Sequence, residues 1–197
     1  MTRAGGIAVH AGTDGYAITG NLVCSNTATT EGGGIVHMGT ANGGSIRDNL
    51  IYFNAIAPTQ AGGFGGGGIE IGGEPNPVGT AVGTPSGSVT VERNLIHGNQ
   101  ASMIGAGVLL LAPLDSPVTV QNNMITGNVA NESGGGIYAV DASNVRLVGN
   151  TLAANVVTAS SPTTTAGVIA VASSIFGARI PPRIGGPSRL RRFMPIR

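Results

Sequence analysis

Two glutamates are the clearest candidates for acid–base chemistry in this sequence. Glu70 and Glu74 lie four residues apart, at the start of an irregular Gly- and Pro-rich stretch, 72–88. A pair of carboxylates can act as general acid and general base in glycoside cleavage, and long loops on a rigid scaffold often carry function. In the alternative, purely structural interpretation, Glu70 points outward from a strand and Glu74 belongs to an irregular loop.

The other titratable residues form no recognisable catalytic or metal-binding pattern. The histidines and aspartates fall at different phases of the repeat described below, so their side chains are not expected to converge as metal ligands must. These residues are His10, His37, His97, Asp14, Asp48, Asp115 and Asp141. We therefore predict no metal site and no bound cofactor. Cys24 is the single cysteine, which excludes an internal disulfide and a multi-cysteine zinc site.

Composition favours a narrow core of small and β-branched side chains. The 197 residues include 34 glycines, and 41% are hydrophobic but only 4% aromatic. Residues 1–178 contain four arginines and nine acidic residues, which gives no nucleic-acid-binding signature. There is no apolar run long enough for a transmembrane helix, and no signal peptide is recognisable after Met1.

Two short patterns recur along the chain. The first is a glycine-containing run that ends in an aliphatic residue, as in Gly32-Gly33-Gly34-Ile35. The second is Asn, two mostly apolar residues, two variable residues and Asn, as in Asn49-Leu50-Ile51 followed by Asn54. In four of five copies the aliphatic residue precedes the first Asn by 13–15 residues, and an insertion within 72–88 lengthens the remaining copy. Such periodicity is typical of a solenoid.

A third apolar segment precedes each Asn pattern, so every repeat contains three short strands with alternating side chains. Strands this short become stable only by stacking on the next coil. The sequence therefore predicts an all-β, right-handed parallel β-helix over residues 1–175, with about six coils of three short strands each. Residues 176–197 form an Arg- and Pro-rich tail that we predict to be disordered, although anion binding is an alternative role.

The asparagines are expected to form two hydrogen-bonded ladders along the solenoid and to accommodate left-handed bends between strands. The first ladder comprises Asn21, Asn49, Asn94, Asn123 and Asn150. The second comprises Asn26, Asn54, Asn99, Asn128 and Asn155.

These repeats resemble those of the pectate-lyase-like right-handed β-helix superfamily, and within it the repeat proteins secreted or displayed by bacteria, including the polymorphic outer-membrane protein type. The resemblance covers residues 5–171 and implies a secreted or cell-surface location. For an enzyme of this superfamily it would imply clustered aspartates, some binding Ca²⁺. Calcium is therefore the one cofactor that the resemblance suggests.

Two surface features have alternative interpretations. Arg47, Glu92 and Gln121 align across coils, and so do Asp48 and Arg93, either as a substrate-binding stripe or as exposed ion pairs. An outward row on the first strand of each coil is mostly apolar and suggests a packing or interaction face. Its members are Ala8, Val36, Glu70, Leu109, Tyr138 and Ile169.

The leading functional hypothesis is a structural or interaction module, a fragment of a secreted or surface β-helix protein that presents a face to a polysaccharide or to another protein. The alternative is a polysaccharide lyase, glycoside hydrolase or epimerase with a cleft beside the 72–88 loop. We also expect uncapped end coils to associate end to end.

Overall fold

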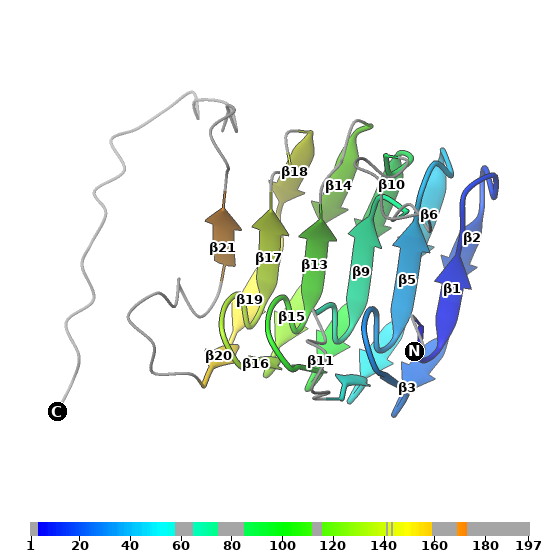
Figure 1. Cartoon of the computed structure of the whole chain (residues 1–197). Coiled ribbons are helices and arrows are strands. Elements are labelled where there is room, and N and C mark those ends of the chain that lie inside the picture. The colour runs from blue at the N-terminus through cyan, green and yellow to red at the C-terminus, as the bar shows by residue number, and fades with distance from the viewer. Residues whose placement is uncertain are drawn as a thin grey trace, which may run out of the picture.

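The computed structural model describes residues 4–57, 65–74, 85–111, 116–140, 142 and 144–158, together with the backbone of 169–172. Within these residues there is no helix, and all strand pairs are parallel (Figure 1). The strands are grouped into four sheets, here named A to D in the order in which the chain enters them. Each sheet takes one strand from every coil, which is the organisation of a parallel β-helix.

Sheet A has six strands and sheets B, C and D have five each. Sheet A contains β1 (Ile7–Val9), β5 (Ile35–Met38), β9 (Ile69–Gly72), β13 (Val108–Leu111), β17 (Ile137–Val140) and β21 (Ile169–Ala172). Sheet B contains β2 (Ala17–Thr19), β6 (Gly44–Arg47), β10 (Val89–Glu92), β14 (Val118–Gln121) and β18 (Val145–Val148). Sheet C contains β3 (Leu22–Cys24), β7 (Leu50–Tyr52), β11 (Leu95–His97), β15 (Met124–Thr126) and β19 (Thr151–Ala153). Sheet D contains β4 (Thr27–Ala28), β8 (Ala55–Ile56), β12 (Gln100–Ala101), β16 (Val129–Ala130) and β20 (Val156–Val157).

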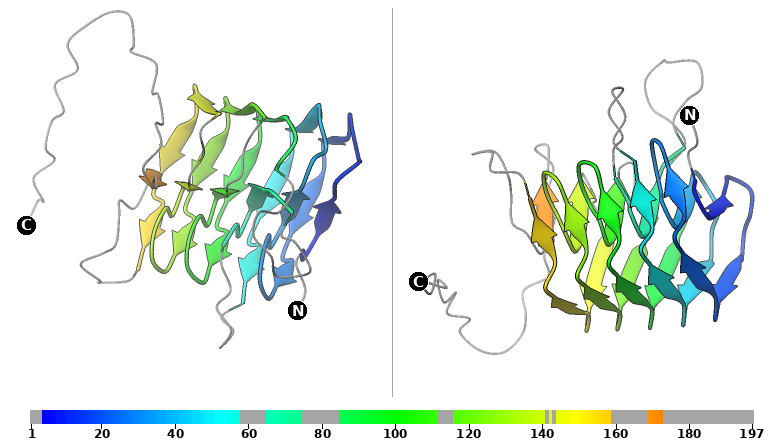
Figure 2. Two further views of the ribbon diagram at one scale, coloured as in Figure 1. Left: turned by 45° about the horizontal axis from the view of Figure 1, so that its top comes forward. Right: turned by 90° about the horizontal axis from the view of Figure 1, so that it is seen from below.

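The solenoid predicted from the repeats is confirmed, with one addition. The described residues form five coils with a strand in every sheet, and β21 adds the first strand of a sixth. Each coil has a fourth strand, of only two residues, after the second Asn. Sequence reasoning missed it because two residues are too few to show an alternating pattern. Figure 2 shows the coils stacked side by side from two further directions.

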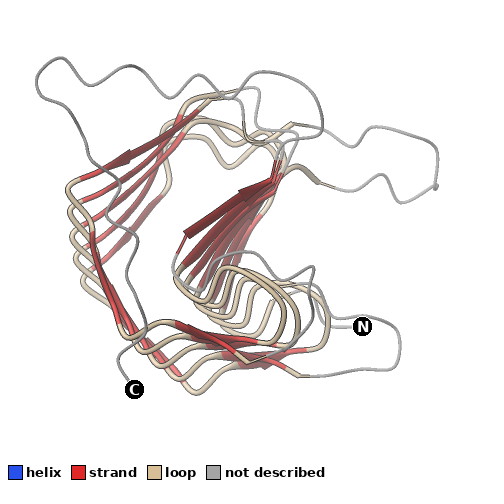
Figure 3. Ribbon diagram, turned by 90° about the vertical axis from the view of Figure 1, so that its left-hand side faces the viewer, coloured by secondary structure: helices blue, strands red, loops and turns tan. Residues whose placement is uncertain are grey.

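The core is a column of aliphatic side chains inside the coils. Alternation directs Ile35 and His37 of β5 inward, and they lie in register with Ile69 and Ile71 of β9. Seen along the axis, the strands of successive coils superimpose around this column (Figure 3). The inward row is fully buried from the second coil to the fourth, so each coil covers the apolar interior of its neighbours.

Both asparagine ladders are present, as predicted. In the first, the backbone N–H and the Nδ2 of Asn49 both donate to Oδ1 of Asn94, at 3.0 Å each. The same pair of bonds joins every consecutive member from Asn21 to Asn150, and the second ladder repeats it from Asn26 to Asn155. The ladders therefore link the coils by side chains as well as by backbone.

The left-handed bends lie one residue earlier than predicted. The ladder asparagines themselves do not have positive φ; the residue before each of them does. These ten residues are Gly20, Ser25, Asp48, Phe53, Arg93, Gly98, Asn122, Gly127, Gly149 and Ala154. The bend turns the chain so that the following Asn points inward, where its side chain can reach the next coil.

The outward row of sheet A is not the exposed stripe that the sequence suggested. Val36 and Leu109 are fully buried, whereas Ala8 is exposed and Tyr138 half-buried. The turn before each strand curls back toward this face (Figure 3). A Cβ at Gly105, where φ is +62°, would lie 2.8 Å from the Cβ of Leu109. The glycine pattern therefore lets a coil cover its own outward residue, and at Val36, Glu70 and Leu109 this row packs within the molecule.

Candidate ligand-binding groove

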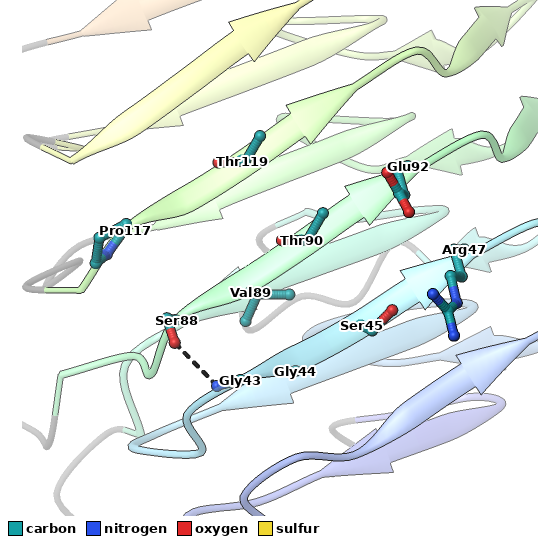
Figure 4. A pocket seen from close by; sticks show the side chains of 10 residues that line it. All are labelled: Gly43, Gly44, Ser45, Arg47, Ser88, Val89, Thr90, Glu92, Pro117 and Thr119. Atoms are coloured by element: carbon teal, nitrogen blue, oxygen red, sulfur yellow. Dashed lines mark hydrogen bonds between the residues drawn. The ribbon is translucent and has the colours of Figure 1, made fainter.

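The outer face of sheet B carries a shallow groove of about 380 Å³. Strands β6, β10 and β14 and the turns before them form its floor and one end (Figure 4). The lining residues are Gly43, Gly44, Ser45, Arg47, Ser88, Val89, Thr90, Glu92, Pro117 and Thr119. At one end of the groove, the backbone N–H of Gly43 donates a hydrogen bond to the Ser88 hydroxyl at 2.9 Å and so joins two neighbouring coils.

Alternation along the strands places hydroxyl groups along this groove. In β10, Val89 and Val91 are buried in the core, so Thr90 and Glu92 point outward. Thr90 lies in register with Ser45 on one side and with Thr119 on the other. Three hydroxyls therefore form a row across three coils, with rungs about 4.8 Å apart.

A charged network borders the hydroxyl row at the carboxyl ends of the strands. Arg93 donates to both carboxylate oxygens of Asp48, at 2.8 and 2.9 Å, and also contacts Glu92 at 2.9 Å. Gln121 Nε2 donates to Glu92 at 2.8 Å. The alignment predicted from the sequence is confirmed, since Arg47, Glu92 and Gln121 lie in register and Arg93 reaches Asp48 on the neighbouring coil.

This network favours the ionised form of both carboxylates. The hydrogen bond from Arg93 lowers the pKa of Asp48. The hydrogen bond from Gln121, assisted by the charge of Arg93, lowers the pKa of Glu92. Arg47 lies in register with Glu92, is exposed, and donates from Nε to the Thr19 hydroxyl at 3.4 Å. The groove therefore combines neutral hydroxyls with fixed charges, an arrangement suited to binding a polar ligand.

The two candidate catalytic glutamates have different surroundings. Glu70 is only 2% exposed, and its Oε2 accepts a hydrogen bond from the backbone N–H of Gly32 at 2.9 Å. Glu74 is half-buried, and its Oε1 lies 3.5 Å from Nδ1 of His10. Residues 75–84 of the insertion lie outside the described residues. Glu70 thus joins the turn of one coil to the strand of the next, whereas Glu74 faces an imidazole at the surface.

The other titratable candidates do not gather at one place. His37 is in the core, Asp14 accepts from the backbone N–H of Asn42 at 2.7 Å, and His97 lies on the outer face of sheet C. Asp115, Asp141 and the tail 176–197 lie outside the described residues. In the part of the chain that the structure describes, no three His, Cys, Asp or Glu residues are grouped to hold a metal ion.

Sequence reasoning missed the hydroxyl row of the groove. Ser45 and Thr90 are 45 residues apart, and Thr90 and Thr119 are 29 apart, so unequal loops hide their equivalence. A usable signal was the pair of strands Val89-Thr90-Val91 and Val118-Thr119-Val120, in which an outward threonine separates two core valines.

Four parallel sheets, a column of aliphatic residues and two asparagine ladders define a parallel β-helix repeat protein. The family model for the right-handed β-helix region matches residues 2–177. The chain therefore belongs to this right-handed β-helix family, which agrees with the hand predicted from the sequence. No curated protein and no solved structure matches the chain significantly. The described residues contain no helix with the length and apolar character needed to cross a membrane.

Proposed function

We propose that this chain is a binding module of a secreted or cell-surface protein and that the groove on sheet B holds an extended polysaccharide. The observation that supports this most directly is the row of Ser45, Thr90 and Thr119 hydroxyls. The rung spacing of about 4.8 Å is close to the length of one sugar residue in an extended chain. Successive hydroxyls can therefore bond to successive sugars, while Arg47 and Glu92 orient polar substituents at the edge.

Binding assays with single-hydroxyl variants test this proposal. Calorimetric titration of the purified protein with soluble neutral and acidic polysaccharides is expected to give saturable binding. Thr90→Val and Thr119→Val keep the side-chain shape but remove a hydroxyl, and each is expected to weaken binding several-fold. Thr27→Val on sheet D, where Thr27 is exposed, is the matched control and should leave the affinity unchanged. Equal affinities for all three variants would contradict the proposal.

An enzymatic role is the second candidate, favoured by the contact between Glu74 and His10 beside the insertion. A carboxylate and an imidazole at this distance could share proton transfer in the cleavage or epimerisation of a polysaccharide. Incubation with acidic polysaccharides would then release saccharides or form unsaturated ends. This activity should be lost in Glu74→Gln and retained in Thr27→Val. Absence of any product from the native protein would remove this candidate.

We also propose that the module associates end to end. In sheets B and C, the terminal strands are β2 and β3, which pair on one side only among the described residues. An edge strand of this kind can accept a further strand through its backbone groups. Light scattering is expected to show a molar mass that rises with protein concentration. A constant monomer mass at high concentration would contradict this proposal.

A further inference from the structure

Three aromatic side chains form a cluster on the outer side of sheet C. Tyr52 and His97 are partners in register on β7 and β11, and their ring centroids lie 6.0 Å apart with an edge-to-face geometry. Phe53 follows β7 directly. Its ring lies 5.6 Å from that of His97, also edge-to-face, and 6.2 Å from that of Tyr52. The cluster lies on a different sheet from the groove and shares no residue with it.

The fold does not require an aromatic residue at position 53. The equivalent positions in the other coils are occupied by Ser25, Gly98, Gly127 and Ala154, all small. Phe53 has φ +52°, a left-handed conformation that is costly for a bulky residue, and 61% of it is exposed. A strained residue that exposes an apolar ring contributes little to the core, and such strain is a pointer to function.

Contacts with the neighbouring coil restrict two of the three rings. The Phe53 ring lies over the backbone of Gly98, where an added Cβ would be 2.5 Å from Cε1 of Phe53. The His97 imidazole is fixed through Nδ1, which lies 3.0 Å from the Thr126 hydroxyl. The imidazole also lies beside Gly127, which has no side chain and so leaves room for the ring. Side chains restricted in this way lose less conformational entropy when they bind a ligand.

The chemistry of the surrounding face selects an uncharged ligand. The ten outward positions of sheet C contain no Asp, Glu, Lys or Arg. They are Leu22, Cys24, Leu50, Tyr52, Leu95, His97, Met124, Thr126, Thr151 and Ala153. These outward positions therefore carry no Asp, Glu, Lys or Arg charge to attract an anionic polymer or a charged peptide, whereas sheet B carries such charges. Aromatic rings with polar atoms at their edges suit a ligand that is apolar on one side and polar at its rim.

We propose that Tyr52, Phe53 and His97 form a binding site for a neutral saccharide, separate from the groove on sheet B. The C–H face of one sugar ring packs on the exposed ring of Phe53. The hydroxyls at the rim of the sugar bond to the Tyr52 hydroxyl and to Nε2 of His97. Leu50 and Leu95, in register beside the cluster, contact the next sugar. This proposal goes beyond the groove, since it concerns another face and an uncharged ligand.

Titration of the full chain with neutral tetrasaccharides tests the site. The probes are cellotetraose, mannotetraose and xylotetraose, followed by NMR of the Phe and His ring protons. At least one is expected to bind and to shift the Phe53 and His97 signals. Phe53→Ser should weaken binding at least tenfold. It should fold normally, because Ser25 occupies the same corner in the first coil. Val156→Ser removes another exposed apolar side chain, on sheet D, and should leave binding unchanged.

Two results would overturn the proposal. The first is failure of all three tetrasaccharides to bind, or binding that Phe53→Ser leaves intact. The second is an analytical ultracentrifugation result in which the native chain dimerises and Phe53→Ser is monomeric, since the cluster would then be an interface with a second copy. Thr90→Val separates this site from the groove: it should weaken polysaccharide binding on sheet B without affecting the tetrasaccharide signals of Phe53.

Discussion

The hydroxyl of Tyr16 and Nδ1 of His37 lie 2.9 Å apart inside the β-helix. Tyr16 reaches this position because the residue in register with it on the next coil is Gly44, whose missing side chain leaves room for the Tyr16 ring. His37 is fully buried, and its Nε2 has no hydrogen-bond partner among the described residues. Burial lowers the pKa of His37 to about 4.

This histidine is expected to make stability depend on pH. In the unfolded chain His37 takes up a proton near its ordinary pKa of 6.5, whereas the folded protein resists protonation until about pH 4. The effect of His37 on the free energy of unfolding is therefore absent above pH 6.5, where the residue is neutral in both states. As the pH falls toward 4, the free energy of unfolding drops by about 3 kcal/mol in total, at 1.36 kcal/mol per pKa unit. Urea unfolding measured between pH 4 and pH 7 checks the size and sign of the effect.

His37→Leu is the control for this prediction. A leucine occupies the equivalent position in the fourth coil, Leu110, so the variant should fold. It should lose most of the pH dependence between pH 5 and 6.5, while the carboxylates of Asp48 and Glu92 titrate alike in both proteins. An unchanged pH profile in His37→Leu would show that another group is responsible.

Interior ladder positions should matter more than terminal ones. Asn94→Ala removes the acceptor of two hydrogen bonds from Asn49 and the donor to Asn123. Because these groups are buried, the free energy of unfolding is expected to fall by about 3 kcal/mol or more. Asn21→Ala at the exposed end of the same ladder should cost less than about 1 kcal/mol. Urea denaturation measures both free energies of unfolding, and equal losses in the two variants would contradict the expected difference between interior and terminal positions.

The left-handed corners predict opposite effects for two substitutions. Ala154 has φ +53°, so Ala154→Gly should raise the free energy of unfolding by about 0.5–1 kcal/mol. Gly20 has φ +70° and open space where a Cβ would lie, so Gly20→Ala should lower it by about 1 kcal/mol through backbone strain alone. Thermal unfolding of both variants checks the signs. If both substitutions changed the free energy of unfolding in the same direction, the left-handed backbone conformation of these two corners would be contradicted.

Glu70 and Glu74 are expected to differ in their structural importance. Glu70→Ala removes the carboxylate acceptor of the Gly32 N–H, which retains its longer bond to the Gly65 carbonyl at 3.2 Å. The loss of this charge-assisted bond should lower the free energy of unfolding by about 2 kcal/mol. Glu74→Ala removes a surface contact with His10, the side-chain contact of Glu74 seen among the described residues, and should cost less than about 1 kcal/mol. Chemical denaturation at pH 7 measures both. A larger loss in Glu74→Ala would mean that the insertion depends on this residue.

The sequence alone was sufficient for the coils and for the ladders. The aliphatic residue after the glycine run, such as Ile35, and the paired asparagines, such as Asn49 and Asn54, recur in each of the five complete coils. They recur because each coil must match its immediate neighbours in side-chain size and hydrogen bonding. Stacking between neighbours imposes that requirement at every repeat, so it leaves a periodic trace in the sequence. The groove was less visible, because only an outward Thr in two strands marked it.

The tertiary structure decided what each outward side chain meets. Val36, Glu70 and Leu109 are buried because the preceding glycine turn covers them, and the type of the outward residue itself does not reveal this. Tyr16 meets His37, and Ser45 lines up with Thr90, only because loops of unequal length bring the strands into register. Contacts between residues 21 and 45 positions apart have no local sequence pattern, so the packed coils alone determine them.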